Sequence, residues 1–420
     1  MRILFFSDNF KPETCPPAIH VYERAKIWTE WGHKVTVITT APNFPEGVVF
    51  PGYTNAWRRI EQMDGIRVVR VKSFITANKG FLLRILDFTS LVAPAVLAAL
   101  REVKPDVVIS TSPQLFTPVA GLMYARLKRI PHVFELRDLW PASIVGTGFM
   151  KAGRLYRILE RLELSLYRRS ARIVSITRSF AADLISRGVP ESKIDVVMSG
   201  TNLDTFKPRA KDQEIVQEYG LQGRFVIGYL GTLGIAHGLE NALRAADLLR
   251  DTNIVFLFVG SGAAAQKLEN LARDLDLSNV IFVDRHRNEE MPRFCSVCDL
   301  ALVHLRNKEV FRTVIPTKVF DSMAMGIPIL FVGPVGEGST LVENHGAGIV
   351  VPPEDPVRLA DAARSMAEEH SLRELCGRNG VEAAALYSRS RHAGGTLAVL
   401  ERALSTERET AGVCASSLIR

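Results

Sequence analysis

The residues best placed to do chemistry lie within one short stretch of the sequence, Val314–Pro328. Thr317, Lys318 and Asp321 supply a hydroxyl, an ammonium and a carboxylate about one helical turn apart. The ammonium could neutralise a diphosphate, and the carboxylate could accept hydrogen bonds from a ribose diol. The start of such a helix also offers free backbone N–H groups and the positive end of the helix dipole, which suit a phosphate. This spacing therefore indicates a site for a nucleotide.

The same stretch predicts the helix that would carry these side chains. Pro316 is typical of the start of a helix, and Gly326 followed by Pro328 is typical of its end. A buried parallel strand is expected directly afterwards, over Ile327–Val332. An ordinary solvated Lys–Asp pair on the helix surface would give the same pattern, so both interpretations remain open. The expected apolar face consists of Val319, Phe320, Met323 and Ala324.

Two loops that contain glycine are predicted at strand ends upstream of this helix. Gly231–Gly234 follows a strand expected at Phe225–Leu230, and Gly260–Gly262 follows a strand expected at Ile254–Val259. Glycine lets a ligand approach the backbone, whose N–H groups can then bind phosphate, although glycines also serve tight turns. We expect these loops and the helix to form one nucleotide-binding crevice. Its candidate residues are Gly231, Thr232, Gly234, His237, Gly260, Gly262, Thr317, Lys318 and Asp321.

The composition is that of a folded protein with more than one domain. A chain of 420 residues is too long for one typical core, and its 47% hydrophobic and 23% charged residues are ordinary for a globular protein. The formal net charge of +7 favours an anionic partner such as a nucleotide or a phospholipid. Cys295 and Cys298 have no second pair at metal-ligand spacing, so buried thiols are expected and no metal site.

Two features favour a cytoplasmic protein, either free or peripheral on the inner face of the plasma membrane. Only four apolar residues follow Met1 and Arg2 before Ser7, which fits a first strand better than a signal peptide. The most apolar long segment, Phe81–Leu100, is interrupted by charged residues and a proline, so no membrane-spanning helix is expected.

Strand and helix signals alternate along both halves of the chain. In the first half, strands are expected at Ile3–Phe6, Lys34–Thr39, Ile66–Val71 and Asp106–Ser110, with helices at Ala18–Trp31, Phe81–Val103 and Gln114–Lys128. This alternation predicts an α/β fold with doubly wound parallel sheets, in which ligands bind at the carboxyl ends of the strands. Signals for a strand, a turn and a linker meet in Pro190–Pro208. We therefore predict domains at residues 1–200 and 201–390, followed by a C-terminal helix and a disordered tail at 391–420.

Three loops at strand ends of the first domain could contact an acceptor or a partner. They are Asp8–Ile19, Pro42–Gly47 and the segment that starts at Arg137. The first loop lacks the glycines of a dinucleotide-binding turn. Contact with an acceptor or with the other domain is therefore favoured for it over phosphate binding. The second loop could equally be a packed connection, the Arg–Asp pair of the third could be a buried ion pair, and His20 is better explained as a surface helix residue. The candidate acceptor residues are Pro16, His20, Asn43, Phe44, Asp138 and Trp140, and Arg137 is a candidate catalytic residue.

Two stretches could lie on a membrane surface. The first is a basic stripe along one predicted helix, with leucine and isoleucine side chains expected to face elsewhere; in the second, Lys79 and Arg84 flank the apolar segment Phe81–Leu100. A basic amphipathic surface can lie on anionic lipid, but a charged stripe can also be an ordinary solvated face. The stripe consists of Arg154, Arg157, Arg161 and Arg168.

Several motifs together resemble a large family of retaining glycosyltransferases with the GT-B fold, the family usually numbered four. Gly32-His33 before a strand is similar to the family's G-H-x-V motif, and Gly200–Pro208 resembles its N-G-x-D-x-x-x-F-x-P linker, with Ser199 where Asn is usual. Ile315–Pro328 resembles its signature helix. The resemblance runs from the first residue to about residue 390. The segments PNFPEG, RDLWP and IPTK resemble a subgroup that builds bacterial surface polysaccharides with acetamido-deoxysugars.

This resemblance implies two Rossmann-like domains that face each other across a cleft, with the acceptor on the first and the nucleotide sugar on the second. It implies transfer of a sugar, with retained configuration, from a nucleoside diphosphate sugar to a lipid-linked saccharide acceptor. UDP with an N-acetylated deoxyhexose is the favoured donor and GDP-mannose the alternative; the product would belong to an O-antigen, capsule or exopolysaccharide. No metal or other cofactor is expected, because cations and helix ends can stabilise the departing diphosphate.

The resemblance also assigns roles to particular residues. Asp321 corresponds to the second Glu of the family's E-x7-E motif and should bind the ribose, whereas Thr313 replaces the first Glu. The family's phosphate-binding Lys corresponds to His237, and its Arg corresponds to Thr232. Arg137 lies near the family's N-domain His that holds the transferred sugar. The diphosphate charge is then left to Lys318, the N–H groups of Gly231–Gly234, and Arg306 or Arg312.

Two other classes of protein remain open at this stage. A sugar-nucleotide epimerase could share the two-domain architecture, and it would convert its nucleotide sugar without an acceptor. A non-catalytic sugar-nucleotide-binding protein would explain the departures at Thr313 and His237. Nucleic-acid binding is least favoured, because basic and aromatic residues are not interleaved as in single-strand platforms.

Overall fold

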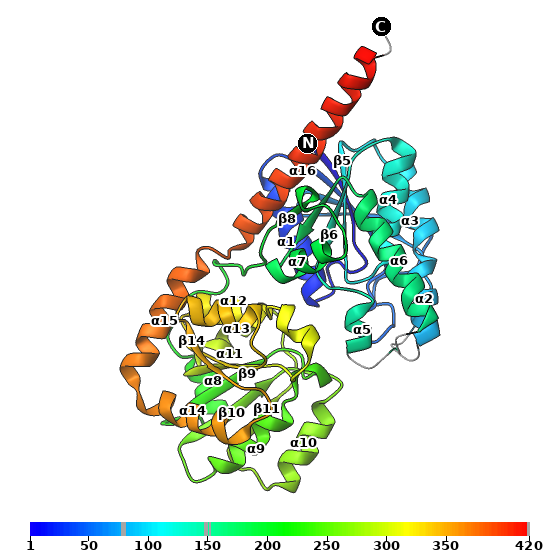
Figure 1. The fold of residues 1–420 in the computed structure, drawn as a ribbon. Helices are drawn as coiled ribbons and strands as arrows, with labels where there is room; N and C mark the ends of the chain where they lie inside the picture. Colours follow the sequence, from blue (N-terminus) through cyan, green and yellow to red (C-terminus); the bar gives the residue numbers. More distant parts are fainter. Residues whose placement is uncertain (77–80, 147–149, 151–152, 418–420) are drawn as a thin grey trace. The chain divides into compact units, whose positions relative to one another are not determined.

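The chain forms two compact units in the computed structural model (Figure 1). The structure describes residues 1–76, 81–146, 150 and 153–417, with the side chains of residues 81–84 and 407–417 left out. The first unit contains residues 1–198 and 392–420, and the second contains residues 199–391. The first unit is therefore built from two separate stretches of the sequence, because it includes the C-terminal residues.

A single sheet of parallel strands with one antiparallel edge forms the centre of the first unit. Its strands are β1 (Arg2–Phe6), β2 (Lys34–Thr40), β3 (Arg58–Met63), β4 (Ile66–Val71), β5 (Val107–Thr111), β6 (His132–Leu136), β7 (Arg172–Ser175) and β8 (Ile194–Val196). The described strands lie in the order β3-β4-β2-β1-β5-β6-β7-β8, and β3 pairs antiparallel with β4. The strand order reverses between β1 and β5, which is where such sheets bind ligands.

Helices cover both faces of this sheet. Their bounds are α1 (Pro16–Glu30), α2 (Phe81–Ser90), α3 (Val92–Leu100), α4 (Phe116–Lys128), α5 (Ala142–Gly146), α6 (Arg154–Arg169), α7 (Arg178–Ser186), η1 (Glu191–Lys193) and α16 (Arg389–Ser417). Side chains alternate along β1, so Leu4 and Phe6 pack under α3 and α4, whereas Ile3 and Phe5 pack under α1 and α16. On the side of α3 and α4, the ring of Tyr167 from α6 packs edge-to-face on Phe134.

The C-terminal helix α16 is part of the core of the first unit. Val399, Leu400 and Ala403 are fully buried in the same cluster as Trp28. The indole Nε1 of Trp28 donates a hydrogen bond to the carbonyl oxygen of Ala393 at 3.0 Å. The last three residues of the predicted tail, 418–420, lie outside the described residues.

The second unit contains a sheet whose described strands are all parallel. They are β9 (Phe225–Leu230), β10 (Ile254–Val259), β11 (Val280–Val283), β12 (Leu300–His304), β13 (Ile329–Val332) and β14 (Gly348–Val351), in the order β11-β10-β9-β12-β13-β14. The order reverses between β9 and β12, so a ligand crevice is expected where these two strands end.

Helices also flank the second sheet on both faces. They are α8 (Gln213–Glu218), η2 (Ile235–His237), α9 (Glu240–Leu248), α10 (Ala265–Asp274), α11 (Met291–Ser296), η3 (Glu309–Thr313), α12 (Thr317–Met325), α13 (Glu337–Asn344), α14 (Pro356–Glu368) and α15 (His370–Ala384). The core on one face joins α9, α10 and α14 to Tyr229, Phe256 and Phe258. Helix α12 contacts β12, β13 and α15.

The predicted α/β fold with two doubly wound domains is confirmed. One difference is that the long helix expected over residues 81–103 is two helices, α2 and α3. Pro94 explains the break, because it has no N–H with which to continue an unbroken helix. A second difference is β3, which the sequence analysis missed; its alternation of half-buried and exposed side chains is weak.

Candidate functional site

The predicted nucleotide-binding residues gather at the switch point of the second sheet. The segments after β9 and β10 contact each other through the N–H of Leu233, which donates to the carbonyl of Ser261 at 2.9 Å. Helix α12 places Lys318 beside the same loop, because its Nζ lies 3.7 Å from the position that a Cβ on Gly231 would occupy. The structure therefore brings the two glycine loops and the start of α12 together, as the sequence analysis expected.

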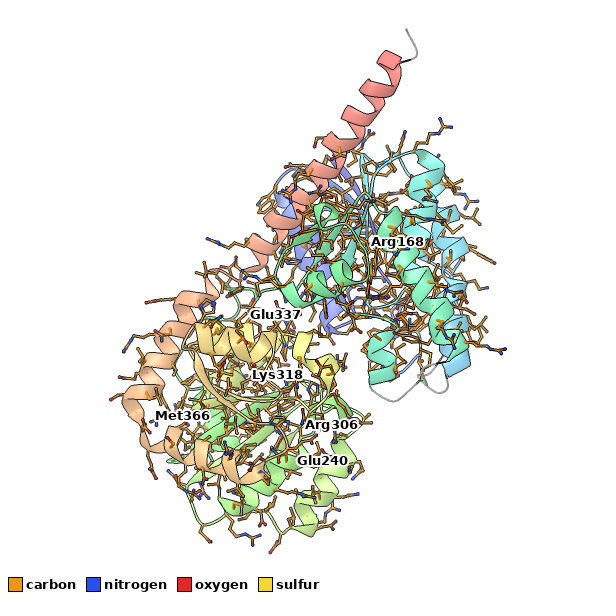
Figure 2. The ribbon with its side chains drawn as sticks, in the orientation of Figure 1. Arg168, Glu240, Arg306, Lys318, Glu337 and Met366 are labelled. Carbon is orange, nitrogen blue, oxygen red and sulfur yellow. The ribbon has the colours of Figure 1, made fainter. Side chains whose placement is uncertain are left out.

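Lys318 has the most unusual environment in this site. Its Nζ lies over the ring of Tyr229, 3.3 Å from the ring centroid, and it is buried without a hydrogen-bond partner among the described residues. Burial lowers the pKa of this ammonium well below its ordinary value, and the nearby carboxylate of Asp321 opposes that shift only in part. Figure 2 shows Lys318 within the second unit.

A buried ammonium without a hydrogen bond is unfavourable in the free protein, since it has lost its water. The face of an aromatic ring attracts a cation, but that attraction is worth only about 1–2 kcal/mol. Nearby, α12 begins with Pro316 as N-cap, and the N–H groups of Thr317 and Lys318 make no hydrogen bond within the described part of the chain. An anion with several oxygens would satisfy the ammonium and these donors at once.

The glycine loops are shaped by their contact with each other. Gly260 has a φ of +146°, and a Cβ there would lie 2.0 Å from the carbonyl oxygen of Gly231. A Cβ at Gly262 would lie 2.4 Å from the carbonyl oxygen of Leu233. Both positions therefore need glycine for close packing of the two loops, whatever ligand they bind.

This packing corrects the expected set of phosphate-binding N–H groups. The N–H of Gly231 donates to the carbonyl of Val259 at 2.9 Å, and the N–H of Leu233 is also used, as described above. Within the segment Gly231–Gly234, only Thr232 and Gly234 keep an N–H without a partner in the described residues. Fewer backbone N–H groups of this segment are thus available to a phosphate than the sequence predicted.

His237 cannot supply the positive charge of the lysine that it replaces. Burial, followed by the charge of Lys318, lowers the pKa of His237 to about 3, so the imidazole is neutral. Its Nδ1 lies 3.3 Å from the carbonyl oxygen of His304, and Nδ1 of His304 hydrogen-bonds in return to the carbonyl of His237. The side-chain amide of Asn241 donates to Nε2 of His304 at 3.1 Å, which holds both rings.

The two arginines that were expected to share the diphosphate charge are already paired. Arg306 donates to the carbonyl of Ile235 at 2.6 Å and to Glu240 at 3.0 Å, and Figure 2 shows Glu240 and Arg306 side by side. Arg312 pairs with Glu309 of its own turn at 3.0 Å. Of the three candidate cations, Lys318 is therefore the one without a carboxylate within ion-pair distance among the described residues.

Asp321 has a contact that the sequence did not predict. Its Oδ1 accepts a hydrogen bond from the hydroxyl of Thr201, which is buried. The backbone of Thr201 is held in turn by Tyr387 and Arg389 at 2.9 Å each. The carboxylate thus connects the segment around Thr201 to α12. The binding of ribose by Asp321 stays a prediction. Thr313, where the family has an acid, donates its hydroxyl to the carbonyl of Val310 at 3.0 Å.

In the first unit, Arg137 belongs to a buried network of charges. Its Nη2 hydrogen-bonds to Nδ1 of His20, and its Nη1 lies 3.5 Å from the carboxylate of Glu135. Burial raises the pKa of Glu135, but Arg24 and Arg137 outweigh it and hold that pKa well below the usual range. His20 is buried, so its interpretation as a surface residue is wrong. His392 of α16 also lies beside Glu135.

Glu13, which the sequence analysis missed, organises the two proline-containing loops. Its carboxylate accepts hydrogen bonds from the N–H groups of Phe10, Asn43 and Phe44 and from the side-chain amide of Asn9, at 2.8–3.2 Å. Phe44 remains exposed, as a residue that contacts a ligand must be. Pro16 is also exposed, but it forms the first turn of α1.

Of the other two acceptor candidates, Asp138 is half-buried and Trp140 is buried. Asp138 accepts a hydrogen bond from the hydroxyl of Ser143 at 2.8 Å, and burial raises its pKa. Trp140 is buried and packs edge-to-face against Phe116, with ring centroids 6.5 Å apart. Trp140 therefore serves the core, and contacts of either residue with an acceptor remain predictions.

The basic stripe is exposed along α6, but the apolar side chains are not all on the opposite side as expected. Leu159 and Leu166 are buried, whereas Leu155 and Ile158 are exposed beside the arginines. Lys79 lies outside the described residues, as does the side chain of Arg84. The exposed arginines are Arg154, Arg157, Arg161 and Arg168.

None of the helices in the described part of the chain is both long and apolar enough to cross a membrane. Among the same residues, no group of three or more His, Cys, Asp or Glu side chains could hold a metal ion.

Both halves of the chain match known protein families. Residues 17–200 match the family described as "Glycosyl transferase 4-like domain", and residues 211–383 match "Glycosyl transferases group 1". The chain is a group 1 glycosyltransferase. The epimerase and the non-catalytic binding protein that the sequence left open are therefore set aside, and the expected enzyme class is confirmed.

Individual relatives agree with this glycosyltransferase assignment. WcaI of Escherichia coli (strain K12), whose name places it in colanic acid biosynthesis, is 26% identical over 334 residues, which are 78% of this chain and 82% of WcaI. The glycosyltransferase WbjE of Pseudomonas aeruginosa is 30% identical over 265 residues, which are 62% of this chain and 66% of WbjE. The crystal structure of Anabaena HepE in complex with UDP-glucose has a TM-score of 0.71 at 17% identity and covers 97% of this chain and 100% of HepE. Each unit of the glycosyltransferase accordingly has the Rossmann-like form found in GT-B enzymes.

Proposed function

We propose that this glycosyltransferase moves a sugar from a nucleoside diphosphate sugar to a lipid-linked saccharide acceptor during synthesis of a surface polysaccharide. In this proposal the donor is a UDP-linked N-acetylated deoxyhexose, the configuration at C1 is retained, and no metal takes part. The bond between C1 and the diphosphate breaks as the oxygen of an acceptor hydroxyl bonds to C1. The diphosphate leaves with the bonding electrons, and its departing oxygen takes up the proton of that hydroxyl. The site must therefore stabilise negative charge on the departing diphosphate.

One observation carries the proposal: the buried ammonium of Lys318 has no anionic partner within ion-pair distance in the described chain. It lies at the start of α12, where backbone N–H groups are available, and beside the loop at Gly231. A fixed cation in a dry site stabilises developing charge without having to reorganise, which is where electrostatic catalysis is most effective. His237 is neutral there, so Lys318 supplies the charge.

The names of the relatives support the choice of donor and product. WcaI is named for colanic acid biosynthesis, which favours a polysaccharide product, and the HepE structure contains UDP-glucose. The acetamido-deoxysugar, the lipid-linked acceptor and the retained configuration rest on the sequence motifs alone.

The donor can be tested by thermal unfolding in the presence of a panel of UDP and GDP sugars. A ligand that binds the folded state raises its melting temperature, and we expect UDP sugars to do so for the parent protein. Lys318→Ala should lose this stabilisation and reduce turnover by orders of magnitude. Lys207→Ala, which removes the same charge from an exposed position of the same unit, should behave like the parent.

Transfer itself needs a separate measurement. Incubation with the stabilising UDP sugar and a lipid-linked acceptor should give a larger saccharide. Its new glycosidic bond should have the same anomeric configuration as the donor, as measured by proton NMR. Stabilisation by GDP-mannose and not by UDP sugars would overturn the proposed donor, and inversion at C1 would overturn retention. Normal turnover in Lys318→Ala would overturn the role of Lys318.

A further inference from the structure

The outer side of three helices in the first unit combines exposed apolar side chains with basic ones. Helices α3, α4 and α6 form one layer, since α3 contacts α4 and α4 contacts α6, and they lie along one side of the sheet in Figure 1. We call the outward side of these helices the α3–α4–α6 face. Its exposed apolar side chains are Leu97, Leu100, Met123, Leu127, Leu155 and Ile158.

These apolar side chains are truly outside the core. Leu97 is 54% exposed, Leu127 is 63% exposed and Ile158 is 60% exposed. On each helix they recur at spacings of three or four residues, for example Leu97 and Leu100, or Met123 and Leu127. That spacing places them along one line of each helix, on the side opposite the buried line that contacts the sheet.

Basic side chains surround the apolar ones, whereas the acids of these helices are already neutralised. Glu102, which follows α3, forms ion pairs with Arg58 and Arg67 at 2.5 and 2.7 Å. In α6, Glu163 is buried and Glu160 is half-buried, and both pair with Arg187. These acids therefore pair with arginines outside the face and do not offset its positive charge. The exposed arginines of the face include Arg101, Arg126, Arg129, Arg154, Arg157 and Arg161.

An anionic bilayer fits this arrangement better than another macromolecule. A second copy of the chain would bring the same positive face against itself and be repelled. Single-stranded nucleic acid would be bound through stacked aromatic rings as well as charge, but the exposed apolar side chains of this face are aliphatic. Arginines that bind lipid phosphates beside aliphatic side chains that enter the interface are typical of peripheral membrane helices.

We propose that the α3–α4–α6 face binds an anionic membrane surface, with the three helices lying in the plane of the interface. Helix α6 starts beyond the carboxyl end of β6 and ends where Ala171 bonds back to the amino end of that strand. Its first arginines therefore lie toward the carboxyl ends of the strands, where a lipid-linked acceptor would be needed. The inference goes beyond the proposed function and does not depend on the identity of the sugar.

Sedimentation with vesicles tests this inference. The full-length parent should bind vesicles of phosphatidylcholine that contain phosphatidylglycerol, and it should not bind phosphatidylcholine alone. The triple variant Arg154→Glu, Arg157→Glu, Arg161→Glu should bind the anionic vesicles at least about a hundredfold more weakly, because each basic residue near such a surface contributes about fivefold or more. Leu127→Ser with Ile158→Ser should weaken the binding that persists at high salt.

A charge-matched control separates this face from the net charge of the protein. Arg224→Glu, Arg244→Glu, Arg378→Glu makes the same change in net charge at exposed positions of the second unit, and it should bind vesicles like the parent. UDP-dependent thermal stabilisation should be unchanged in both triple variants, so a failure of the proposed donor would be seen separately. Equal loss of binding in both triple variants, unchanged binding in the α6 variant, or binding of the parent to RNA but not to vesicles would overturn the inference.

Discussion

The buried ammonium of Lys318 lowers the stability of the free protein, but it can strengthen the binding of an anionic ligand. Its ammonium is enclosed by protein, and the ring of Tyr229 offers it only a weak attraction. His237, its neighbour, is neutral and so adds no repulsion. A nucleoside diphosphate that enters the site would supply the negative charge that the ammonium lacks. Part of the binding free energy would therefore come from pairing this buried ammonium.

The stability of the free protein should therefore depend on pH through Lys318. Its pKa in the folded state lies well below that of the unfolded chain. Between the two values the unfolded chain binds the extra proton, so this side chain destabilises the fold least at high pH. The free energy of unfolding should rise with pH by at most about 1.4 kcal/mol per pH unit.

Urea unfolding of the parent and of Lys318→Met at pH 6, 7.5 and 9 measures this effect. Methionine cannot titrate, so the difference between the two proteins should shrink or change sign in favour of the parent as the pH rises. Saturating UDP should remove the pH dependence. A constant difference across the three pH values would show that the ammonium is not held in a dry site.

Single residues were predicted where their chemistry stands out in the sequence. Lys318 was found because a lysine, a threonine and an acid share one turn beside a helix start. Tyr229 and Thr201 were missed, because their contacts with α12 depend on how distant segments pack. The neutrality of His237 could not be predicted either, since it results from burial and from a neighbour 81 positions away in the chain.

At the scale of elements, the two glycine loops pack together as one unit at the edge of the second sheet. The loop after β10 packs on the loop after β9 so closely that neither Gly260 nor Gly262 has room for a side chain. The sequence predicted that glycine was needed at these strand ends. It could not show that the reason was contact between the loops, because the strand order brings them together.

Gly260→Ala should destabilise the second unit by about 3 kcal/mol or more. The added methyl group would overlap the carbonyl of Gly231, and the φ of +146° is strained for alanine. Gly220→Ala is the matched control, because Gly220 has a φ of +64° but open space around its Cβ position, and it should cost only about 1 kcal/mol. Urea unfolding compares the two, and equal losses would mean that backbone strain alone matters.

At the scale of the whole molecule, α16 belongs to the first unit although it is the last element of the chain. Val399, Leu400 and Ala403 complete the core that also contains Phe5 and Trp28. His392, at the start of the same helix, lies beside the buried Glu135. The first unit is therefore complete only when the C-terminal helix is present.

Leu400→Ala should lower the free energy of unfolding of the first unit by about 2–5 kcal/mol, because it leaves a cavity in a closely packed core. Glu401→Ala, on the next and exposed position, should change it by less than about 0.5 kcal/mol. Hydrogen exchange of the first unit in each variant makes the comparison. Equal protection in both variants would place α16 outside the cooperative core.

The overall architecture was predictable because strand and helix periodicities are local. The expected strand at Ile66–Val71 and the end of α12 at Gly326 appear in the structure. The edge strand β3 and the break between α2 and α3 were missed, since pairing and a single Pro94 decided them. The exposed leucines of the α3–α4–α6 face were not foreseen either, because a helical pattern alone does not show which apolar side chains the sheet covers.

The protonation of Lys318 can be followed directly. NMR of the lysine side chains, assigned with Lys318→Ala, can follow its titration with and without UDP. We expect Lys318 to titrate well below the other lysines in the free protein and its pKa to move back toward that of an ordinary lysine when UDP binds. An ordinary pKa in the free protein that UDP leaves unchanged would contradict this expectation.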